Sequence, residues 1–153
     1  MTGRTHDLAA ITALGAVVII NPVSTMRLST VIATVIANQI GGILPDIDQP
    51  TAPFWKDLPI TRVFGRFAGR VLGGHRFLTH SILGLFIFGS LARMLLAFIH
   101  PLMPNIDVGI VWWGFMIGVV SHLIMDSLTE EGVPWLLPIP IKFGFPPIRR
   151  WRI

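Results

Sequence analysis

The chain has 153 residues, 52% of them hydrophobic and only 13% charged, and its formal net charge is +4. This length favours one domain, residues 1–153, and the low charged fraction excludes an ordinary soluble domain, in which about a quarter of the residues are charged. A mean hydropathy of +0.70 therefore predicts a membrane protein. In such proteins, basic residues more often determine the topology or contact anionic headgroups than bind nucleic acid.

Four apolar segments follow one another along the chain. The first, from Leu8 to Ile20, is short for a span, and its start is also typical of a signal peptide; we retain it because no clean cleavage site follows. The other three run from Leu28 to Leu44, from Ser81 to Ile99 and from Val108 to Met125. Each of these reaches the roughly 17 residues that a spanning helix needs. We therefore predict an all-α integral membrane bundle of about four transmembrane helices.

Residues 60–72, between the second and third segments, predict an interfacial amphipathic helix. Its arginines Arg62, Arg66 and Arg70 recur at every fourth position, and apolar residues with helical spacing separate them. Membrane adhesion is the simpler interpretation; the alternative is that these arginines, with Arg76, bind the phosphate of a lipid. The tail from residue 135 onward has too many prolines for a span, and we expect it to return along the interface and close over the site.

The basic residues also predict the orientation. With four spans, both termini and the loop 45–79 share one side, which carries nearly all of the Lys and Arg residues. The positive-inside rule places that side in the cytoplasm. We therefore expect a multi-pass protein of the bacterial or archaeal cytoplasmic (inner) membrane.

Histidines and carboxylates gather at the same predicted side, at the ends of all four apolar segments. They are His6, Asp46, Asp48, His75, His80, His122 and Asp126. A charged group near hydrocarbon costs several kcal/mol unless it is compensated, and a bound metal is a good compensation. Without cysteine, a zinc site must use imidazole and carboxylate ligands. The pattern predicts one metal site at one mouth of the bundle.

The spacing of these residues leaves alternatives open. His122 and Asp126 share a helix face as two ligands would, although a pair facing water fits the same spacing about equally well. An extended chain at 46–48 would turn Asp46 and Asp48 to one side, whereas an Asx-rich turn that ends the helix is the alternative.

The histidines of the third segment differ in their predicted positions. Thr79 is the expected cap of the helix, and His80 would enter its first turn as a ligand. His75, after two glycines, would lie in the loop and either bind the metal or orient another ligand.

Four motifs, in this order, resemble the YdjM-like family of inner-membrane-associated metal-dependent hydrolases over nearly the whole chain. They are T-H at 5–6, G-G-I-L-P-D-I-D at 41–48, H-R-F-L-T-H-S at 75–81 and S-H-L-I-M-D-S-L-T-E-E-G-V-P at 121–134. The resemblance implies a helical membrane protein with a metal site in these motifs and hydrolase activity. More distantly, the pair His122 and Asp126 is similar to the His-x-x-x-Asp pair of zinc-dependent phospholipase C and P1-type nucleases. Because this chain is shorter and lacks their later His and Glu ligands in recognisable spacing, we expect one or two metal ions rather than three.

The expected function is hydrolysis of a phosphoester in a phospholipid or lipid-linked phosphate. The cofactor would be a divalent metal, zinc or else manganese. Asp48, or Glu130 or Glu131, would accept a proton from water, and Arg76 would neutralise substrate charge. Membrane lipid and anionic headgroups are the expected partners, and the oligomeric state is open.

Two other classes of function stay open. One is a metal transporter or sensor, which the absence of an evident polar path across the bundle disfavours. The other is a non-catalytic membrane adaptor with a structural metal site.

Overall fold

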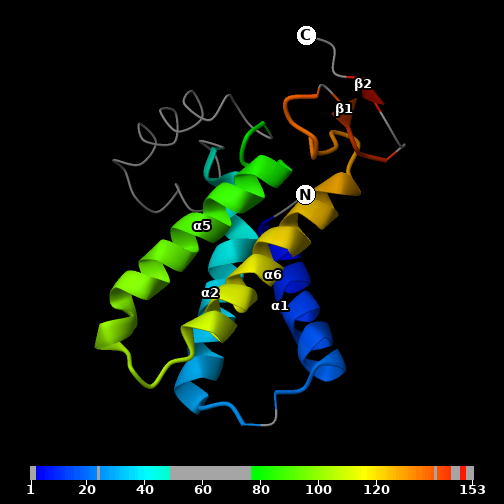
Figure 1. The fold of residues 1–153 in the computed structure, drawn as a ribbon. Helices are drawn as coiled ribbons and strands as arrows, with labels where there is room; N and C mark the ends of the chain where they lie inside the picture. Colours follow the sequence, from blue (N-terminus) through cyan, green and yellow to red (C-terminus); the bar gives the residue numbers. More distant parts are fainter. Residues whose placement is uncertain (1–2, 24, 49–76, 140, 146–148, 151–153) are drawn as a thin grey trace, which may run out of the picture.

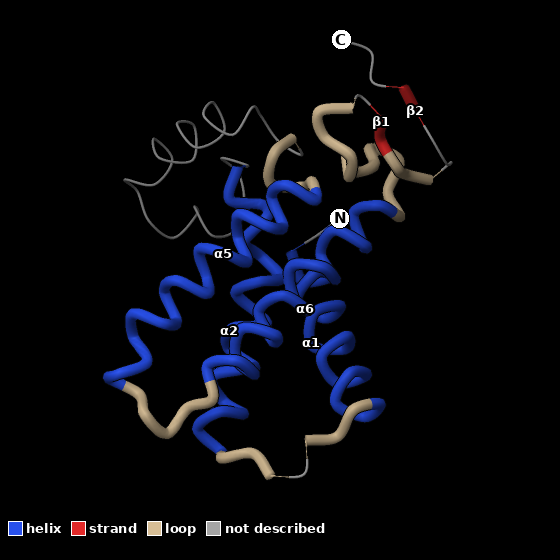
Figure 2. Tube along the Cα trace, viewed as in Figure 1, coloured by secondary structure: helices blue, strands red, loops and turns tan. Residues whose placement is uncertain are grey.

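Four α-helices dominate the computed structural model, which describes residues 3–23, 25–48, 77–139, 141–145 and 149–150 (Figure 1). The helices are α1 (Gly3–Ile20), α2 (Leu28–Ile43), α5 (Ile82–Ile99) and α6 (Val108–Ser127). Two short 3-10 helices, η1 (Leu44–Asp48) and η2 (His100–Leu102), continue α2 and α5. Figure 2 shows that helix accounts for most of the described trace. The predicted all-α bundle is confirmed.

Three helical segments are long and apolar enough to cross a membrane: Leu28–Ile47, Ile82–Leu102 and Val108–Ser127. They match the second, third and fourth predicted segments. The first helix, α1, is not among the described helices that meet this criterion. It is nevertheless one continuous helix, and it begins five residues before the apolar segment from which we predicted it. The predicted amphipathic helix at 60–72 lies outside the described residues.

Helix α6 lies at the centre of the bundle and packs against α2, α1 and α5 (Figure 1). Its contact with α2 is very close, because Gly114 and Gly118 face the backbone of Thr34 and Asn38. The Asn38 amide donates a hydrogen bond of 3.1 Å to the Gly114 carbonyl. In a membrane, helices gain little free energy by burying apolar side chains, because the lipid tails are equally apolar. Close packing of small residues and interhelical hydrogen bonds hold them together instead.

The end of the bundle farthest from the chain termini is held by polar contacts (Figure 1). Asp107 caps α6 by accepting hydrogen bonds from Gly109 N and Ile110 N, and its own N–H donates to the Thr30 hydroxyl at 3.0 Å. Arg27 donates to the side chain of Asn105. These contacts fix α2 against the start of α6.

At the opposite end, Ser81 caps α5 by accepting a hydrogen bond of 3.1 Å from Gly84 N. The prediction that Thr79 is the cap and that His80 enters the first turn is wrong, since both residues lie in the turn before the helix. The reason is that Ser81 also donates to the Leu78 carbonyl at 2.7 Å, which closes the preceding turn and moves the helix start two residues onward.

The segment after α6 is tied to the same end of the bundle. Gly132 has φ of 66°, a left-handed conformation that suits glycine, and Val133 then pairs with Phe143 in an antiparallel bridge. Strands β1 (Ile141–Lys142) and β2 (Arg149–Arg150) form a two-stranded antiparallel ladder. The Trp135 carbonyl accepts a hydrogen bond from Ile82 N, and its indole donates to Ser127. The segment therefore joins the start of α5 to the end of α6.

We predict that Gly118→Ala destabilises the bundle, whereas Gly15→Ala does not. A Cβ at Gly118 would overlap the Asn38 carbonyl, while a Cβ at Gly15 meets nothing within 4 Å. Overpacking of this kind costs about 1–3 kcal/mol, and alanine favours helix over glycine by about 1 kcal/mol. Thermal unfolding in mild detergent, followed by circular dichroism, measures the difference. Equal melting temperatures for the two variants would contradict the close α2–α6 contact.

Candidate metal centre

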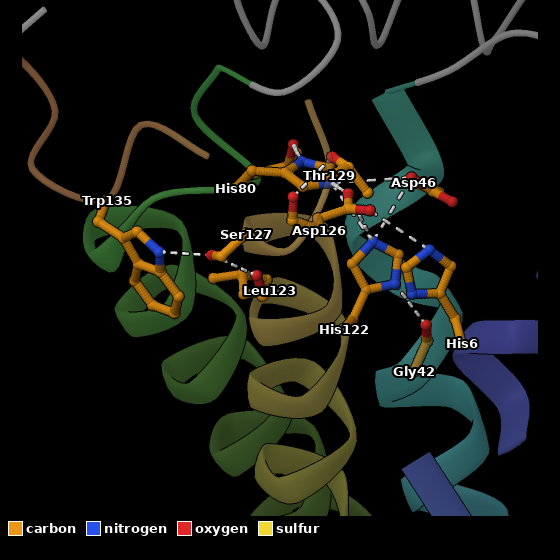
Figure 3. Close-up of polar contacts among 11 residues, drawn as sticks. His6, Gly42, Asp46, His80, His122, Leu123, Asp126, Ser127, Thr129 and Trp135 are labelled. Atoms are coloured by element: carbon orange, nitrogen blue, oxygen red, sulfur yellow. Dashed lines mark hydrogen bonds and ion pairs between the residues drawn. The ribbon is translucent and has the colours of Figure 1, made fainter. Parts of the chain in front are cut away.

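Five polar side chains meet at the end of the bundle where α1 and α5 begin and α2 and α6 end (Figure 3). Each of the four helical segments, or the turn beside it, contributes at least one of them. They are His6, Asp46, His80, His122 and Asp126. Five of the seven predicted site residues are thus brought together.

Helix α6 contributes His122 and Asp126 on one face, one turn apart. Both side chains are 0% exposed, and the His122 Nε2 atom lies 3.6 Å from Asp126 Oδ2. Burial excludes the alternative in which this pair faces water at a helix end. A buried carboxylate is costly unless it is compensated, so the pair indicates a site.

His80 and Asp46 approach this pair from the turn before α5 and from η1. The His80 Nε2 atom lies 3.2 Å from Asp126 Oδ2 and 3.3 Å from His122 Nε2. Asp46 Oδ1 lies 3.5 Å from His122 Nε2 and 3.7 Å from His80 Nε2. One ligand atom from each of the four residues falls within 4.8 Å of the others, so the group could hold a metal ion.

The Gly42 carbonyl sets the proton position on His122. Its oxygen lies 2.6 Å from His122 Nδ1, and a carbonyl oxygen only accepts, so Nδ1 carries the hydrogen. In the neutral ring, Nε2 then directs its lone pair toward His80 and the carboxylates. A backbone carbonyl that holds the far nitrogen of an imidazole is typical of metal-binding histidines.

His80 has a similar arrangement, because its Nδ1 atom lies 2.8 Å from the Thr79 hydroxyl. The Nε2 atoms of both histidines and two carboxylates therefore face one small space. Two carboxylates in one small buried space repel each other unless a cation lies between them. The donor set therefore fits a divalent metal, with imidazole and carboxylate the ligands that zinc accepts.

His6 lies at the edge of this group. Its Nε2 atom is 3.4 Å from Asp126 Oδ1, and its ring stacks on that of His122 at 3.9 Å. Burial, and next the charge of His122, lower the pKa of His6, which precedes the apolar part of α1, from 6.5 to about 4. The imidazole is therefore neutral at pH 7. Its Nδ1 atom is buried without a hydrogen-bond partner among the residues that the structure describes.

The backbone at Asp46 and Asp48 differs from the prediction. Residues 44–48 form a 3-10 helix instead of an extended chain or an Asx-rich turn that ends the helix, because helical hydrogen bonding continues beyond the end of α2. The Asp46 carboxylate reaches the histidines from this helix. The side chain of Asp48 lies outside the described part of the chain.

The other predicted residues fall elsewhere. His75 and Arg76 lie outside the described residues. Glu130 and Glu131 are exposed in the turn after α6, and the role of proton acceptor stays a prediction. Sequence reasoning missed Gly42 and assigned Thr79 only to capping, because backbone acceptors and turn hydroxyls carry no spacing signal of their own.

Known proteins similar to this chain include inner membrane proteins. The family model described as YdjM inner membrane protein matches residues 1–153. The chain is 34% identical over 109 residues to the inner membrane protein YdjM of Escherichia coli (strain K12) and, to the same extent, to that of Shigella flexneri. Those matches cover 68% of this chain and 48% of each relative, so the chain spans about half their length.

A third relative is matched over more of its length. The uncharacterized protein YvsG of Bacillus subtilis (strain 168) is 26% identical over 146 residues, which is 95% of this chain and 79% of that protein. No solved structure matches the chain.

We predict that Thr79→Val weakens zinc binding about 10–100-fold, the usual cost of losing a group that orients a metal-binding histidine. The change removes the hydroxyl beside His80 Nδ1 and keeps the shape of the side chain. Thr34→Val is the matched control, since Thr34 is also buried and donates to Thr30 O away from the site. Competition with a chelating dye measures the affinity. Equal affinities for the two variants would mean that Thr79 does not orient His80.

Proposed function

The chain belongs to the YdjM inner membrane protein family, and we propose that it is a membrane-bound metal-dependent hydrolase of a phosphoester. Its substrate would be a phospholipid or a lipid-linked phosphate. The observation that carries the proposal is the convergence of His80, His122 and Asp126 at 3.2–3.6 Å. All three are fully buried, and the Gly42 carbonyl fixes the tautomer of His122.

Asp46, His80, His122 and Asp126 would hold the metal, and His6 would support Asp126 from the edge. When bound, a zinc or manganese ion would lower the pKa of a water molecule and polarise the phosphoryl oxygens of a substrate. The Gly42 carbonyl would keep His122 in the ligand tautomer, and the Thr79 hydroxyl would orient the ring of His80. Burial of the histidines and Asp126 limits the access of bulk water.

A lipid substrate is supported by the position of the group. It lies at one end of three helices that are able to cross a membrane, where headgroups rather than hydrocarbon tails are found. Asp46, whose side chain is 20% exposed, is the most exposed member of the group and marks the side from which a headgroup would enter. Arg76 as the cation for the phosphate and Asp48 or Glu130 as the base remain proposals from the sequence.

Transport of the metal is the weaker candidate. A buried polar row does exist on α2, formed by Thr30, Thr34 and Asn38. However, the Thr34 hydroxyl donates to Thr30 O, the Asn38 amide donates to Gly114 O, and Thr30 accepts from Asp107 N. These hydrogen bonds join α2 to its neighbours across a close helix contact, so the row supports packing rather than a path for ions.

We further propose that the metal centre lies on the cytoplasmic side, as the basic residues indicate. The chain has no cysteine, so single cysteines report sidedness directly. Leu136 and Met103 are both exposed. Met103 lies in the connection between α5 and α6, whereas Leu136 follows Trp135, whose carbonyl accepts a hydrogen bond from the start of α5 beside the metal centre. An impermeant maleimide should label Met103→Cys in intact spheroplasts and label Leu136→Cys only after the membrane is opened. The reverse pattern would place the centre outside.

The central test joins metal content to turnover. We expect the purified parent to carry at least one zinc or manganese ion per chain by mass spectrometry. Headgroup release from phospholipid vesicles should fall to background on chelation and return with the metal. His122→Ala and Asp126→Asn should lose both properties, because each removes a ligand from the buried group.

His100→Ala is the matched control, because His100 is exposed at the other end of the bundle. It should retain both metal and activity. Turnover that survives His122→Ala would contradict the mechanism. Metal bound without hydrolysis of any phospholipid or lipid-linked phosphate would favour the non-catalytic adaptor.

A further inference from the structure

A long apolar groove runs along the outer wall of the bundle between α1 and α6. It encloses about 930 Å³, within the usual range of small-molecule pockets, roughly 300–1,000 Å³. Mostly small side chains form its α1 wall, and large apolar side chains form most of its α6 wall. Representative lining residues are Ala9, Ala13, Ala16, Trp113, Met116 and Val120.

The groove results from the spacing of residues on α1. Its buried face carries His6, Ala10 and Leu14. The adjoining face presents Ala9, Ala13 and Ala16 at helical spacing, and these side chains are too small to fill the space beside α6. Because α6 is long and apolar enough to cross a membrane, its wall of the groove would face lipid hydrocarbon.

One end of the groove lies at the same level along α1 and α6 as the metal centre. Thr5, Ser121 and Met125 line the groove, and they are the chain neighbours of three residues of the centre, His6, His122 and Asp126. From Trp113 to Met125 the α6 wall extends about 18 Å at 1.5 Å per residue. That length is close to one leaflet of the bilayer, about half of a hydrocarbon core roughly 30 Å thick.

We propose that this groove binds one acyl chain of a membrane lipid whose phosphorylated headgroup lies at the metal centre. The assignment of the headgroup rests on the proposed function, whereas the binding of the acyl chain does not. The occupant follows from three observations. The lining is apolar along one leaflet depth, and its α6 wall belongs to a helix able to cross a membrane. Two lining residues, Ser121 and Met125, are chain neighbours of members of the only described cluster of histidines and carboxylates that could hold a metal. The groove thus selects long-chain lipids over their soluble analogues.

The test measures lipid retention and turnover separately. The parent, Ala13→Trp and Ala97→Trp are purified in mild detergent and incubated with palmitoyl-oleoyl phosphatidylglycerol or with its dibutyryl analogue. Native mass spectrometry then counts the lipids that remain on each chain. Ala97 is the matched control, since it is exposed on α5 outside the groove.

We expect the parent and Ala97→Trp to retain one long-chain lipid and none of the short analogue. Retention by Ala13→Trp should fall about tenfold or more, because the indole fills the groove. An unchanged metal content in Ala13→Trp shows that the fold and the centre are intact. A chain with His122→Ala, which lacks the metal, should keep its lipid. Lipid retention by the metal-loaded parent without any hydrolysis would contradict the proposed function alone.

Two outcomes would overturn the groove assignment. One is equal retention of lipid by Ala13→Trp and the parent, which would put the lipid elsewhere on the surface. The other is a dimer of the parent that Ala13→Trp converts to a monomer, which would assign the groove to a second copy of the chain.

Discussion

The hydrogen bond between the Gly42 carbonyl and His122 Nδ1, at 2.6 Å, is the contact on which the site depends. It forms only because α2 and α6 approach each other closely, at Gly41 against Phe115 and at Gly118 against Asn38. The same approach brings Asp46, at the end of α2, within 3.5 Å of His122. Helix packing that is typical of membranes therefore also sets the proton position on the imidazole of His122.

Much of the fold was predictable because hydropathy is a strong signal for helices in lipid. The predicted starts at Leu28 and Val108 agree with α2 and α6, and the third segment differs from α5 by one residue. The start of α1 was not predictable in this way, since residues 3–7 are polar and continue the helix without any apolar pattern. The topology predicted that five site residues would lie together. An even number of predicted spans separates each of these positions from the others, so the chain returns to the same end of the bundle every time. The residues are His6, Asp46, His80, His122 and Asp126.

The details that sequence could not supply are local hydrogen bonds. Ser81 rather than Thr79 caps α5 because its hydroxyl reaches both Leu78 O and Gly84 N, and either residue type caps a helix well. The 3-10 turn at 44–48 depends on how α2 ends against its neighbours, which no residue spacing records. The groove depends on how α1 and α6 are rotated relative to each other, which the sequence does not show. From the sequence alone, the alanines of the groove are simply residues that favour helix.

The four-residue group also has a consequence for how the protein is made. Its members are separated by up to 80 positions, from Asp46 to Asp126, and His6 is closer still to the start of the chain. Synthesis from the N-terminus exposes the first histidine long before α6 leaves the ribosome. Until α6 has been inserted beside α2, the carbonyl of Gly42 has no imidazole to hold and Asp46 has no partner on α6. The group is therefore completed late in biogenesis, and capture of a metal by it would distinguish a completely inserted chain from a partly inserted one.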